Sequence, residues 1–166
     1  MKTVAVLMLA AAIQTQPPDF SGTWRLDEAR SNIAATAGIV GLIPAGAPKT
    51  LHITQPSNGS LVIESQINEA HVRIYKPGRE TSTPAGQGGA VTMTTTMDSR
   101  TVTSEGALKA PNGDTTAVKE VLTLSADGKT LTLQTTVGAN ASTMVYSRIT
   151  DVGPCETWPT PCKRFP

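Results

Sequence analysis

The sequence predicts an all-β protein: a single antiparallel up-and-down meander of about eight to ten strands, closed into a barrel, with a short helical or lid segment after the first strand. Two observations predict this fold. From residue 50 to residue 149, short runs rich in Thr, Val, Leu and Ile alternate with clusters of Gly, Asn, Asp and Pro, without a sustained helical period. Every connection after residue 50 is short, whereas a two-layer sandwich usually needs long crossing connections. Closure into a barrel removes the exposed edges of such a meander.

The first strand is predicted in "FSGTWRL", where Gly22 and Trp24 lie two residues apart. The next stretch, "DEARSN", is suited to one helical turn. It is followed by an apolar segment rich in Gly and Ala, "IAATAGIVGLIPAGAPK", and the strand pattern resumes at Thr50. The short helical or lid segment of the predicted fold therefore lies between the first two strands.

Turn signals along the meander predict which residues face each other on neighbouring strands. Asn-Gly dipeptides at residues 58–59 and 112–113 fit three-residue loops, because a two-residue loop at the second site would set Glu105 opposite Glu120 on the apolar face. Further turns are predicted at residues 68–69 and 98–99. The resulting pairs are Ile53 with Ile63, Ile63 with Ile74, Thr95 with Val102, Leu108 with Val118, and Val102 with Leu124.

The clearest hairpin is "EVLTLSADGKTLTLQT". Its Asp127-Gly128 dipeptide between two alternating apolar runs is typical of a two-residue turn, so turn and pattern specify the same register. The pairs are Leu124 with Leu131, Leu122 with Leu133, Glu120 with Thr135, and Val118 with Val137. The predicted inward face of the barrel is then Ile53, Ile63, Ile74, Val91, Met93, Val102, Leu108, Leu122, Leu124, Leu131 and Leu133.

The first 16 residues have the layout of a secretory signal peptide. Lys2 precedes an apolar run from Val4 to Ile13, with an Ala-x-Ala ending at Ala12. The run is shorter than the about 20 residues that span a bilayer, so it predicts export to the periplasm or the cell exterior rather than a transmembrane segment. We expect residues 17–150 to form the barrel and residues 151–166 to form a tail.

Charge and length favour one small domain without a polyanionic partner. The chain has 14 Lys and Arg residues against 13 Asp and Glu residues, and loss of Lys2 with the signal peptide brings the two close to equality. Such a balance recruits neither nucleic acid nor an anionic membrane by charge. The roughly 150 residues that remain suit a single core, and we expect a monomer.

Both cysteines lie in the tail, in "GPCETWPTPCKRFP". In an exported protein this spacing predicts a local disulfide between Cys155 and Cys162. A two-cysteine metal site is the alternative, but no His lies nearby and two ligands rarely hold zinc, so no metal is expected.

The opening "FSGTWRLDEARSN" and the later "KEVLTLSADGKTLTLQT" followed by "MVYSRI" carry a resemblance. Over residues 19–149 the chain resembles lipocalin-like (calycin) barrels and the related fatty-acid-binding proteins, and it is similar to exported bacterial lipocalin-like domains of unassigned function. The resemblance implies that Trp24 packs at the closed end of the barrel beneath Arg148 of the last strand. Gly22, Trp24 and Arg148 are thus the predicted closure residues, with a cation–π contact between ring and guanidinium.

A ligand role competes for the same last strand. Fatty-acid-binding proteins hold a carboxylate inside the barrel with Arg and Tyr two residues apart, and "YSR" places Tyr146 and Arg148 on one face. An inward arginine needs an acidic partner, either a ligand head group or Glu120. The closure role and the ligand role both remain open at this point.

Glu120 is a second candidate, because the hairpin register sends it to the leucine face. A lone inward carboxylate in a pocket indicates a binding site. The alternative is a glutamate at the barrel rim, or one hydrogen-bonded to threonines.

The apolar segment after the first strand has two interpretations. Related barrels carry a lid over the pocket mouth here, which would make Ile39, Val40, Leu42 and Ile43 portal residues. The alternative is a plug packed permanently on the barrel end.

Motifs for catalysis and cofactors are missing from the sequence. It contains no Gly-x-Ser-x-Gly, no His-Glu-x-x-His, no phosphate-binding loop and no dinucleotide fingerprint. His52 and His71 are predicted to face outward. The sequence therefore predicts neither an enzyme nor a bound cofactor.

The predicted function is binding of a small, largely apolar molecule, such as a fatty acid, by an exported barrel. The pocket is predicted to be lined by Met93, Leu122, Leu124, Leu131 and Leu133, with Tyr146, Arg148 and Glu120 orienting a polar end. The alternative is a barrel filled by its own side chains that binds a protein partner or inhibits one. In that case the tail with Trp158 and Phe165, or the segment from Ile39 to Ile43, would provide the surface.

Overall fold

The computed structural model describes residues 18–34, 48–56, 59–66, 70–85 and 88–149. The predicted signal peptide, the predicted portal residues Ile39, Val40, Leu42 and Ile43, and the tail with its predicted Cys155–Cys162 disulfide lie outside these residues. The side chain of His71 lies outside them too. Within the described part of the chain, no helix is long and apolar enough to cross a membrane.

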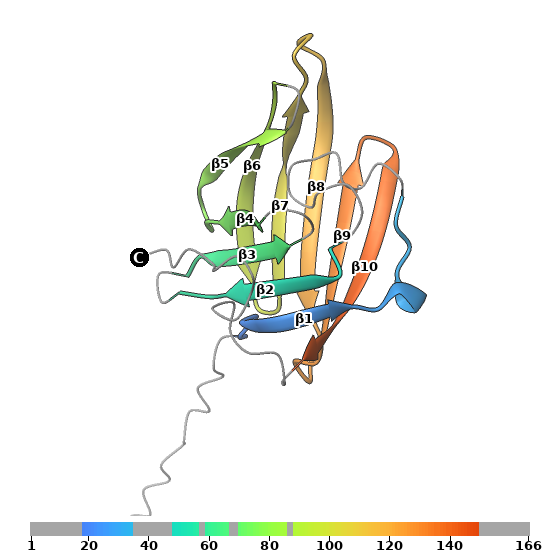
Figure 1. Ribbon diagram of the computed structural model, residues 1–166. Helices are drawn as coiled ribbons and strands as arrows, with labels where there is room; N and C mark the ends of the chain where they lie inside the picture. The colour runs from blue at the N-terminus through green and yellow to red at the C-terminus, as the bar shows by residue number, and fades with distance from the viewer. Residues whose placement is uncertain (1–17, 35–47, 57–58, 67–69, 86–87, 150–166) are drawn as a thin grey trace, which may run out of the picture.

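The described residues form ten antiparallel strands in one nearly closed barrel (Figure 1). The strands are β1 Gly22–Leu26, β2 Thr50–Thr54, β3 Leu61–Gln66, β4 Ala70–Tyr75, β5 Glu80–Ala85, β6 Gly89–Asp98, β7 Thr101–Lys109, β8 Thr115–Leu124, β9 Thr130–Val137 and β10 Asn140–Ile149. One 3-10 turn, η1 (Glu28–Arg30), follows β1 and is capped by Asp27. The predicted all-β meander barrel is confirmed.

The strand order shows how the barrel closes. It runs β4-β3-β2-β1-β10-β9-β8-β7-β6-β5, so the first strand, β1, pairs with the last strand, β10. The unpaired edges belong to β4 and β5, although these strands are consecutive in sequence. In Figure 1, β1 to β3 cross in front of the upright strands β6 to β10, so the sheet folds over on itself around one interior.

The two hairpins with the clearest turn signals in the sequence have the predicted strand registers. In the β8–β9 hairpin, Leu124 faces Leu131, and the other three predicted pairs are also present. Ile53 faces Ile63 across β2 and β3, as the three-residue loop predicts. In the β8–β9 hairpin the turn signal and an apolar alternation agree, which makes one register more stable than the alternatives.

Two registers differ from the prediction by two residues. The β7–β8 loop has three residues as expected, but it is residues 111–113, because the Ala110 N–H donates to the Asp114 carbonyl (2.8 Å). That loop lies one residue earlier than predicted, whereas the β6–β7 turn lies one residue later. The observed pairs are Val102 with Leu122, Leu108 with Thr116, Met97 with Val102, and Thr95 with Ser104. A shift of two keeps each side chain on its predicted face.

The β3–β4 register is wrong by one residue, and this reverses a face. Ile63 pairs with Arg73 instead of Ile74, and Ile74 pairs with Val62. Since successive side chains of a strand point to opposite faces, Arg73 and Tyr75 enter the interior, while Ile74 is only partly buried and Val72 is exposed. Ile74 is therefore not a core residue.

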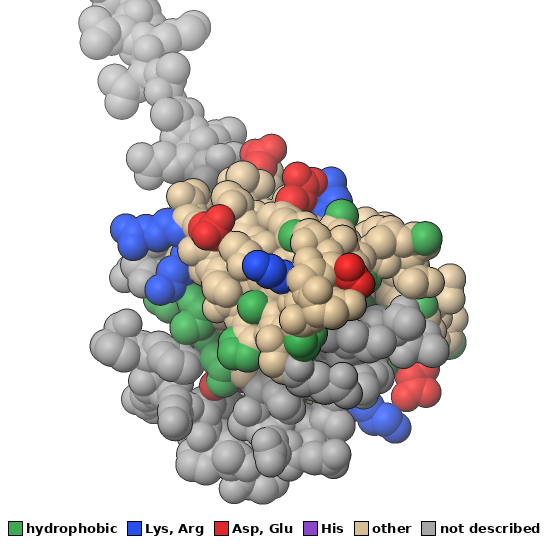
Figure 2. All heavy atoms as spheres, turned by 90° about the horizontal axis from the view of Figure 1, so that it is seen from above, with side chains coloured by type: hydrophobic (Ala, Val, Ile, Leu, Met, Phe, Trp, Pro, Cys, Tyr) green, Lys and Arg blue, Asp and Glu red, His purple; other side chains and the backbone are tan. Residues whose placement is uncertain are grey.

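The core lies inside the barrel. Nine of the eleven residues predicted to face inward belong to the buried cluster, Leu108 packs against it from a partly buried position, and Ile74 is outside it. The cluster also contains aromatic side chains that the pattern did not single out, among them Phe20 and Tyr75. The end face shown in Figure 2 carries scattered single Lys, Arg, Asp and Glu side chains of both signs, in keeping with the near-neutral chain.

Gly106 allows β6 and β7 to approach closely. A Cβ atom built on Gly106 would lie 1.9 Å from the Thr92 carbonyl oxygen and 2.8 Å from the Met93 Cα atom. Both of these are backbone atoms, so neither can rotate away. Gly106 faces Met93 in the ladder, and any side chain at this position would push the two strands apart.

Gly106→Ala is expected to lower the free energy of unfolding by about 1–3 kcal/mol, the usual cost of forcing extra volume into a packed site. Urea denaturation, with the midpoint and slope compared to the unmodified protein, measures this change. Thr94→Ala, at an exposed position of β6, is the control and should change the free energy of unfolding by less than about 0.5 kcal/mol. An unchanged midpoint for Gly106→Ala would show that the strands separate without cost.

Candidate ligand site inside the barrel

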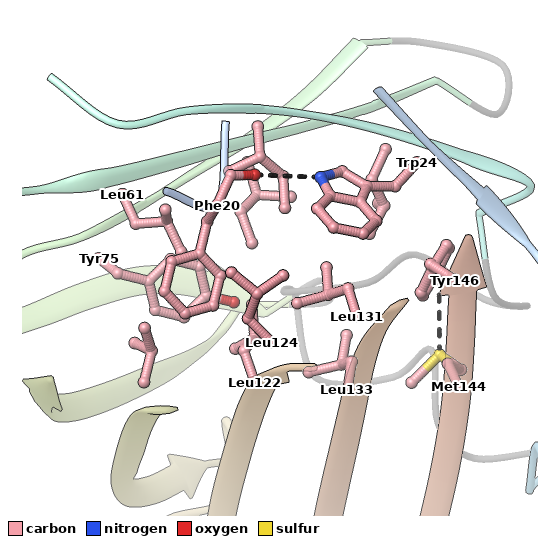
Figure 3. Close-up of a cluster of buried hydrophobic side chains, with 14 of the residues drawn as sticks. Phe20, Trp24, Leu61, Tyr75, Leu122, Leu124, Leu131, Leu133, Met144 and Tyr146 are labelled. Atoms are coloured by element: carbon pink, nitrogen blue, oxygen red, sulfur yellow. Dashed lines mark hydrogen bonds between the residues drawn. The ribbon is translucent and has the colours of Figure 1, made fainter. Parts of the chain in front are cut away.

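The closed end of the barrel is built around Trp24. Trp24 and Arg148 are directly paired across the β1–β10 closure, and the guanidinium carbon of Arg148 lies 4.4 Å from the centroid of the indole ring. The ring is fully buried, and its Nε1 donates to the Phe20 carbonyl (3.1 Å; Figure 3). The predicted contact between Trp24 and Arg148 is confirmed.

All three guanidinium nitrogens of Arg148 donate hydrogen bonds to backbone carbonyls at this closed end. Nη1 donates to the Ser21 carbonyl (2.6 Å), Nη2 to the Asp19 carbonyl (2.8 Å) and Nε to the Gly128 carbonyl (2.9 Å). These bonds tie the segment before β1 and the β8–β9 turn to the last strand. The geometry therefore favours the closure role, while the ligand role of Arg148 stays a prediction.

Gly22 explains why a glycine precedes the tryptophan. Its φ of +141° is one that side chains rarely adopt, and an added Cβ would lie 3.3 Å from Arg148 Nη1. A bulkier residue would strain the start of β1 and crowd the guanidinium group. The Gly-x-Trp motif thus places both the ring and the arginine that covers it.

Tyr146 is buried within the apolar core. Its hydroxyl faces the Met144 sulfur at 4.0 Å (Figure 3), and burial raises its pKa well above the ordinary value for tyrosine. A thioether is a weak acceptor. Tyr146 and Arg148 are thus occupied with different neighbours, and their shared ligand role stays a prediction.

A polar cluster lies inside the barrel, formed by Arg73 and Tyr75 of β4 and Glu120 of β8. The relative exposures of these residues are 4%, 2% and 0%. The Tyr75 hydroxyl donates to Glu120 Oε2 (3.0 Å), and the guanidinium carbon of Arg73 is 5.0 Å from the centroid of the Tyr75 ring. Tyr75 thereby links a buried cation to a buried acid.

Arg73 also joins the two unpaired edges of the sheet. Its Nη1 donates to Thr83 Oγ1 of β5 (2.7 Å), and its Nη2 approaches the Met93 sulfur of β6 (3.3 Å). Because β4 and β5 form no ladder with each other, the Arg73–Thr83 bond spans a seam that the backbone leaves open.

Four buried polar atoms of the described residues have no hydrogen-bond partner. They are Arg73 Nε, Thr81 Oγ1, Glu120 Oε1 and Thr135 Oγ1. Buried polar atoms are nearly always paired, and leaving one unpaired costs about 1–3 kcal/mol. Thr135 lies directly opposite Glu120 in the β8–β9 ladder, so two of these atoms belong to facing residues.

Burial controls the ionisation of the cluster. Removal from water raises the pKa of Glu120 from 4.5 to about 7, although the Arg73 charge and the Tyr75 hydrogen bond act in the opposite direction. Burial also raises the pKa of Tyr75 well above its ordinary value, with a further contribution from the Glu120 charge. Tyr75 is therefore a neutral hydrogen-bond donor, and Glu120 changes charge near neutral pH.

The structure gathers most of the predicted lining residues around this cluster. Met93, Leu122, Leu124, Leu131 and Leu133 all belong to the buried core, together with Glu120. Figure 3 shows Leu122 and Leu124 beside Phe20 and Tyr75, with Leu131 and Leu133 farther along toward Met144 and Tyr146. The prediction that Glu120 faces this leucine surface is confirmed, and its neighbour on β7 is Ser104.

Arg73 and Tyr75 are the site residues that the sequence interpretation missed. The signal was present, because "RIY" has the same spacing of Arg and Tyr as "YSR" and also places both side chains on one face of a strand. The predicted turn at residues 68–69 sent this pair to the outside. His52, by contrast, is on the outward face as predicted, where its Nδ1 lies 3.2 Å from Thr23 Oγ1.

Comparison with known proteins supports the architecture. Neither protein-family models nor curated proteins match the chain. Among solved structures, it is similar to the REP1-NXSQ fatty acid transporter (TM-score 0.59, 15% identity, 81% of this chain and 98% of that one). It is also similar to fatty-acid-binding protein 1 of Echinococcus granulosus (0.58, 16%, 79% and 98%). A secretory abundant heat soluble protein of Ramazzottius varieornatus matches as well (0.58, 14%, 81% and 100%).

These likenesses define the class of fold. The described residues form a nearly closed antiparallel barrel with the same fold as these fatty-acid-binding and heat-soluble proteins. At such low identities the likeness concerns the fold alone, and the site must be argued from its own residues. The similarity to exported bacterial domains stays a prediction.

Proposed function

We propose that the chain binds a small, largely apolar molecule inside the barrel, with the polar end of that molecule at Arg73, Tyr75 and Glu120. The observation that carries this proposal is the unpartnered Oε1 atom of Glu120, a fully buried acid in an apolar core. The fatty-acid-binding structures of the same fold support it, since each is a barrel named for an apolar ligand.

The cluster is hard to explain as a device for stability. Burying charged groups costs several kcal/mol per ion, and apolar side chains of similar volume are often at least as stable in their place. Here the cost is increased by unpaired atoms on both the cation and the acid. A ligand that supplies the missing hydrogen-bond partners would account for the burial of these charged groups.

The walls around the cluster suit an aliphatic ligand. Leucines dominate the core, and Met93 lies against Arg73 through its sulfur. Methionine is unbranched and flexible, so it can move aside more easily than a leucine. Because the core side chains have almost no exposed surface, entry of a ligand requires such a rearrangement.

The second candidate is the filled barrel. The near-complete burial of Trp24, Leu122, Leu131 and Tyr146 favours it, because side chains in an open cavity would retain surface within reach of water. The protein would then act through its outer surface, on a protein partner. In either case we propose binding rather than catalysis, and action of the mature chain as an exported monomer.

Native mass spectrometry of the purified protein, beside a denatured aliquot, tests the proposal. We expect extra mass that disappears on denaturation, together with uptake of a hydrophobic fluorophore that aliphatic molecules displace. Arg73→Met should lower the affinity for ligands with a polar end by about tenfold, which corresponds to the loss of one hydrogen bond to a charged group. A bare mass with no fluorophore uptake would favour the filled barrel.

Arg30→Met is the matched control for Arg73→Met. Arg30 is exposed on η1 and pairs with Asp27 (2.6 Å), so it lies outside the barrel interior. The Arg30→Met substitution should leave ligand affinity unchanged. Equal weakening by both substitutions would show that the loss comes from net charge and not from the buried cluster.

A further inference from the structure

We propose that the cluster accepts a neutral molecule that ends in a hydroxyl group, such as a long-chain alcohol, in preference to a carboxylate. This inference rests on the proposed function and names the ligand class of the same site. It follows from which hydrogen-bonding capacities the cluster has left over.

The unpaired atoms on β8 and β9 fit a hydroxyl. Glu120 Oε1 is an acceptor that lacks a donor, and the Thr135 hydroxyl opposite it lacks any partner. A ligand hydroxyl can donate to Glu120 while it accepts from Thr135. A carboxylate only accepts, so it would satisfy Thr135 and leave two acceptors facing each other at Glu120.

The donors that would hold a carboxylate are already engaged. Tyr75 donates to Glu120, and Arg73 directs Nη1 to Thr83 and Nη2 to the Met93 sulfur. Arg73 retains Nε, and its Nη2 could exchange the weak sulfur acceptor for a ligand oxygen. Neither donor removes the repulsion between a ligand carboxylate and the ionised Glu120.

The charge inside the barrel is also balanced before a ligand enters. Arg73 is the one buried basic side chain of the described residues, and Glu120 provides an acid for it. The other buried acid, Glu64, pairs with His52 and Val72 on the opposite, outward face of β3. A neutral hydroxyl preserves this balance. A second carboxylate would add an unmatched negative charge to an interior in which desolvation is costly, unless Glu120 first took up a proton.

The groups that face Glu120 determine the pH range in which it ionises. Arg73 and Tyr75 face it from β4, Ser104 faces it from β7 and is paired with Thr95 (2.7 Å), and Thr135 faces it from β9. Of these, Arg73 carries the charge and Tyr75 stays neutral. With the pKa of Glu120 at about 7, the acid is largely ionised at pH about 8.5.

The experiment is displacement of a hydrophobic fluorophore by dodecan-1-ol and by dodecanoate, on the full chain at pH about 8.5. The alcohol should bind at least about tenfold more tightly, as expected for a gained hydrogen bond to a charged group. Glu120→Gln should remove most of this difference, because the neutral amide no longer repels the acid. Glu105→Gln is the control, since Glu105 is exposed on β7 and paired with Lys119, and it should keep the preference.

A second measurement needs no variant. Lowering the pH of the unmodified protein from about 8.5 to about 6 should raise the affinity for dodecanoate relative to the alcohol, because Glu120 takes up a proton. A constant ratio would overturn the inference, as would tighter binding of dodecanoate at pH about 8.5 or an unaltered preference in a folded Glu120→Gln protein. If dodecan-1-ol and dodecanoate bind equally, the proposed function stands and the preference for a hydroxyl is wrong. If dodecan-1-ol, dodecanoate and the fluorophore all fail to bind, the proposed function and the hydroxyl preference are both wrong.

Discussion

Trp24→Ala is expected to lower the free energy of unfolding by about 3–5 kcal/mol, the usual cost of truncating a large aromatic side chain in a core. The indole is fully buried, is paired directly with Arg148 and donates to the Phe20 carbonyl. Its loss leaves a cavity at the seam where the first and last strands join. Urea denaturation followed by far-UV circular dichroism measures the change.

A double-mutant cycle separates the cation–π contact from the rest of the effect. Arg148→Met removes the guanidinium that lies over the ring and also its three bonds to backbone carbonyls. The coupling energy between Trp24→Ala and Arg148→Met should be about 0.5–2 kcal/mol. Arg30→Met, with an exposed side chain, should show no coupling to Trp24. A cost below about 1 kcal/mol for Trp24→Ala would show that the closed end does not depend on this ring.

The closure was predictable because it depends on chain order. In a meander that closes, the first and last strands become neighbours, and the resemblance to lipocalin-like barrels indicated Arg148 as the residue that covers Trp24. Trp24 and Arg148 are paired as this argument requires. The β8–β9 hairpin was predictable for a different reason, namely that an Asp-Gly turn and a strict apolar alternation specify one register.

The β3–β4 register was not predictable by the same means. Leu61, Val62 and Ile63 are consecutive apolar residues and all three are buried, so β3 offers no alternation that marks its inner face. On β4, Val72 and Ile74 are the apolar pair, and the pattern turns them inward. The structure instead turns Arg73 and Tyr75 inward, against the rule that strands bury their apolar face.

That exception coincides with the candidate site. Consistent local signals define the scaffold, and functional sites are where such signals are expected to fail. Glu120 could be predicted because its own hairpin has a well-defined register. Its partners Arg73 and Tyr75 were missed despite the spacing in "RIY", because their face depends on a turn whose residues, Asn68 and Glu69, specify neither a turn type nor a face.

The buried acid should also make the stability of the barrel depend on pH. The pKa of Glu120 is about 7 in the folded state and close to the ordinary 4.5 in the unfolded state. Between these values the folded protein binds more protons than the unfolded one, so the free energy of unfolding falls as the pH rises. The stabilisation is complete below pH about 4.5 and lost above pH about 7, and the difference corresponds to about 3 kcal/mol.

Glu120→Gln isolates this contribution, because the amide is neutral throughout. Burial also raises the pKa of Glu64 and lowers that of His52, but both groups are present in the two proteins, so their effects cancel when the two unfolding curves are subtracted. The difference in free energy of unfolding, measured by urea denaturation at steps from pH about 4.5 to about 8.5, should shift by about 3 kcal/mol in favour of Glu120→Gln. Parallel curves would mean that Glu120 ionises as it does in water. A slope removed by the substitution would show that the barrel carries an acid whose charge is costly without a ligand, and a ligand that donates to Glu120 should then recover part of that stability above pH about 7.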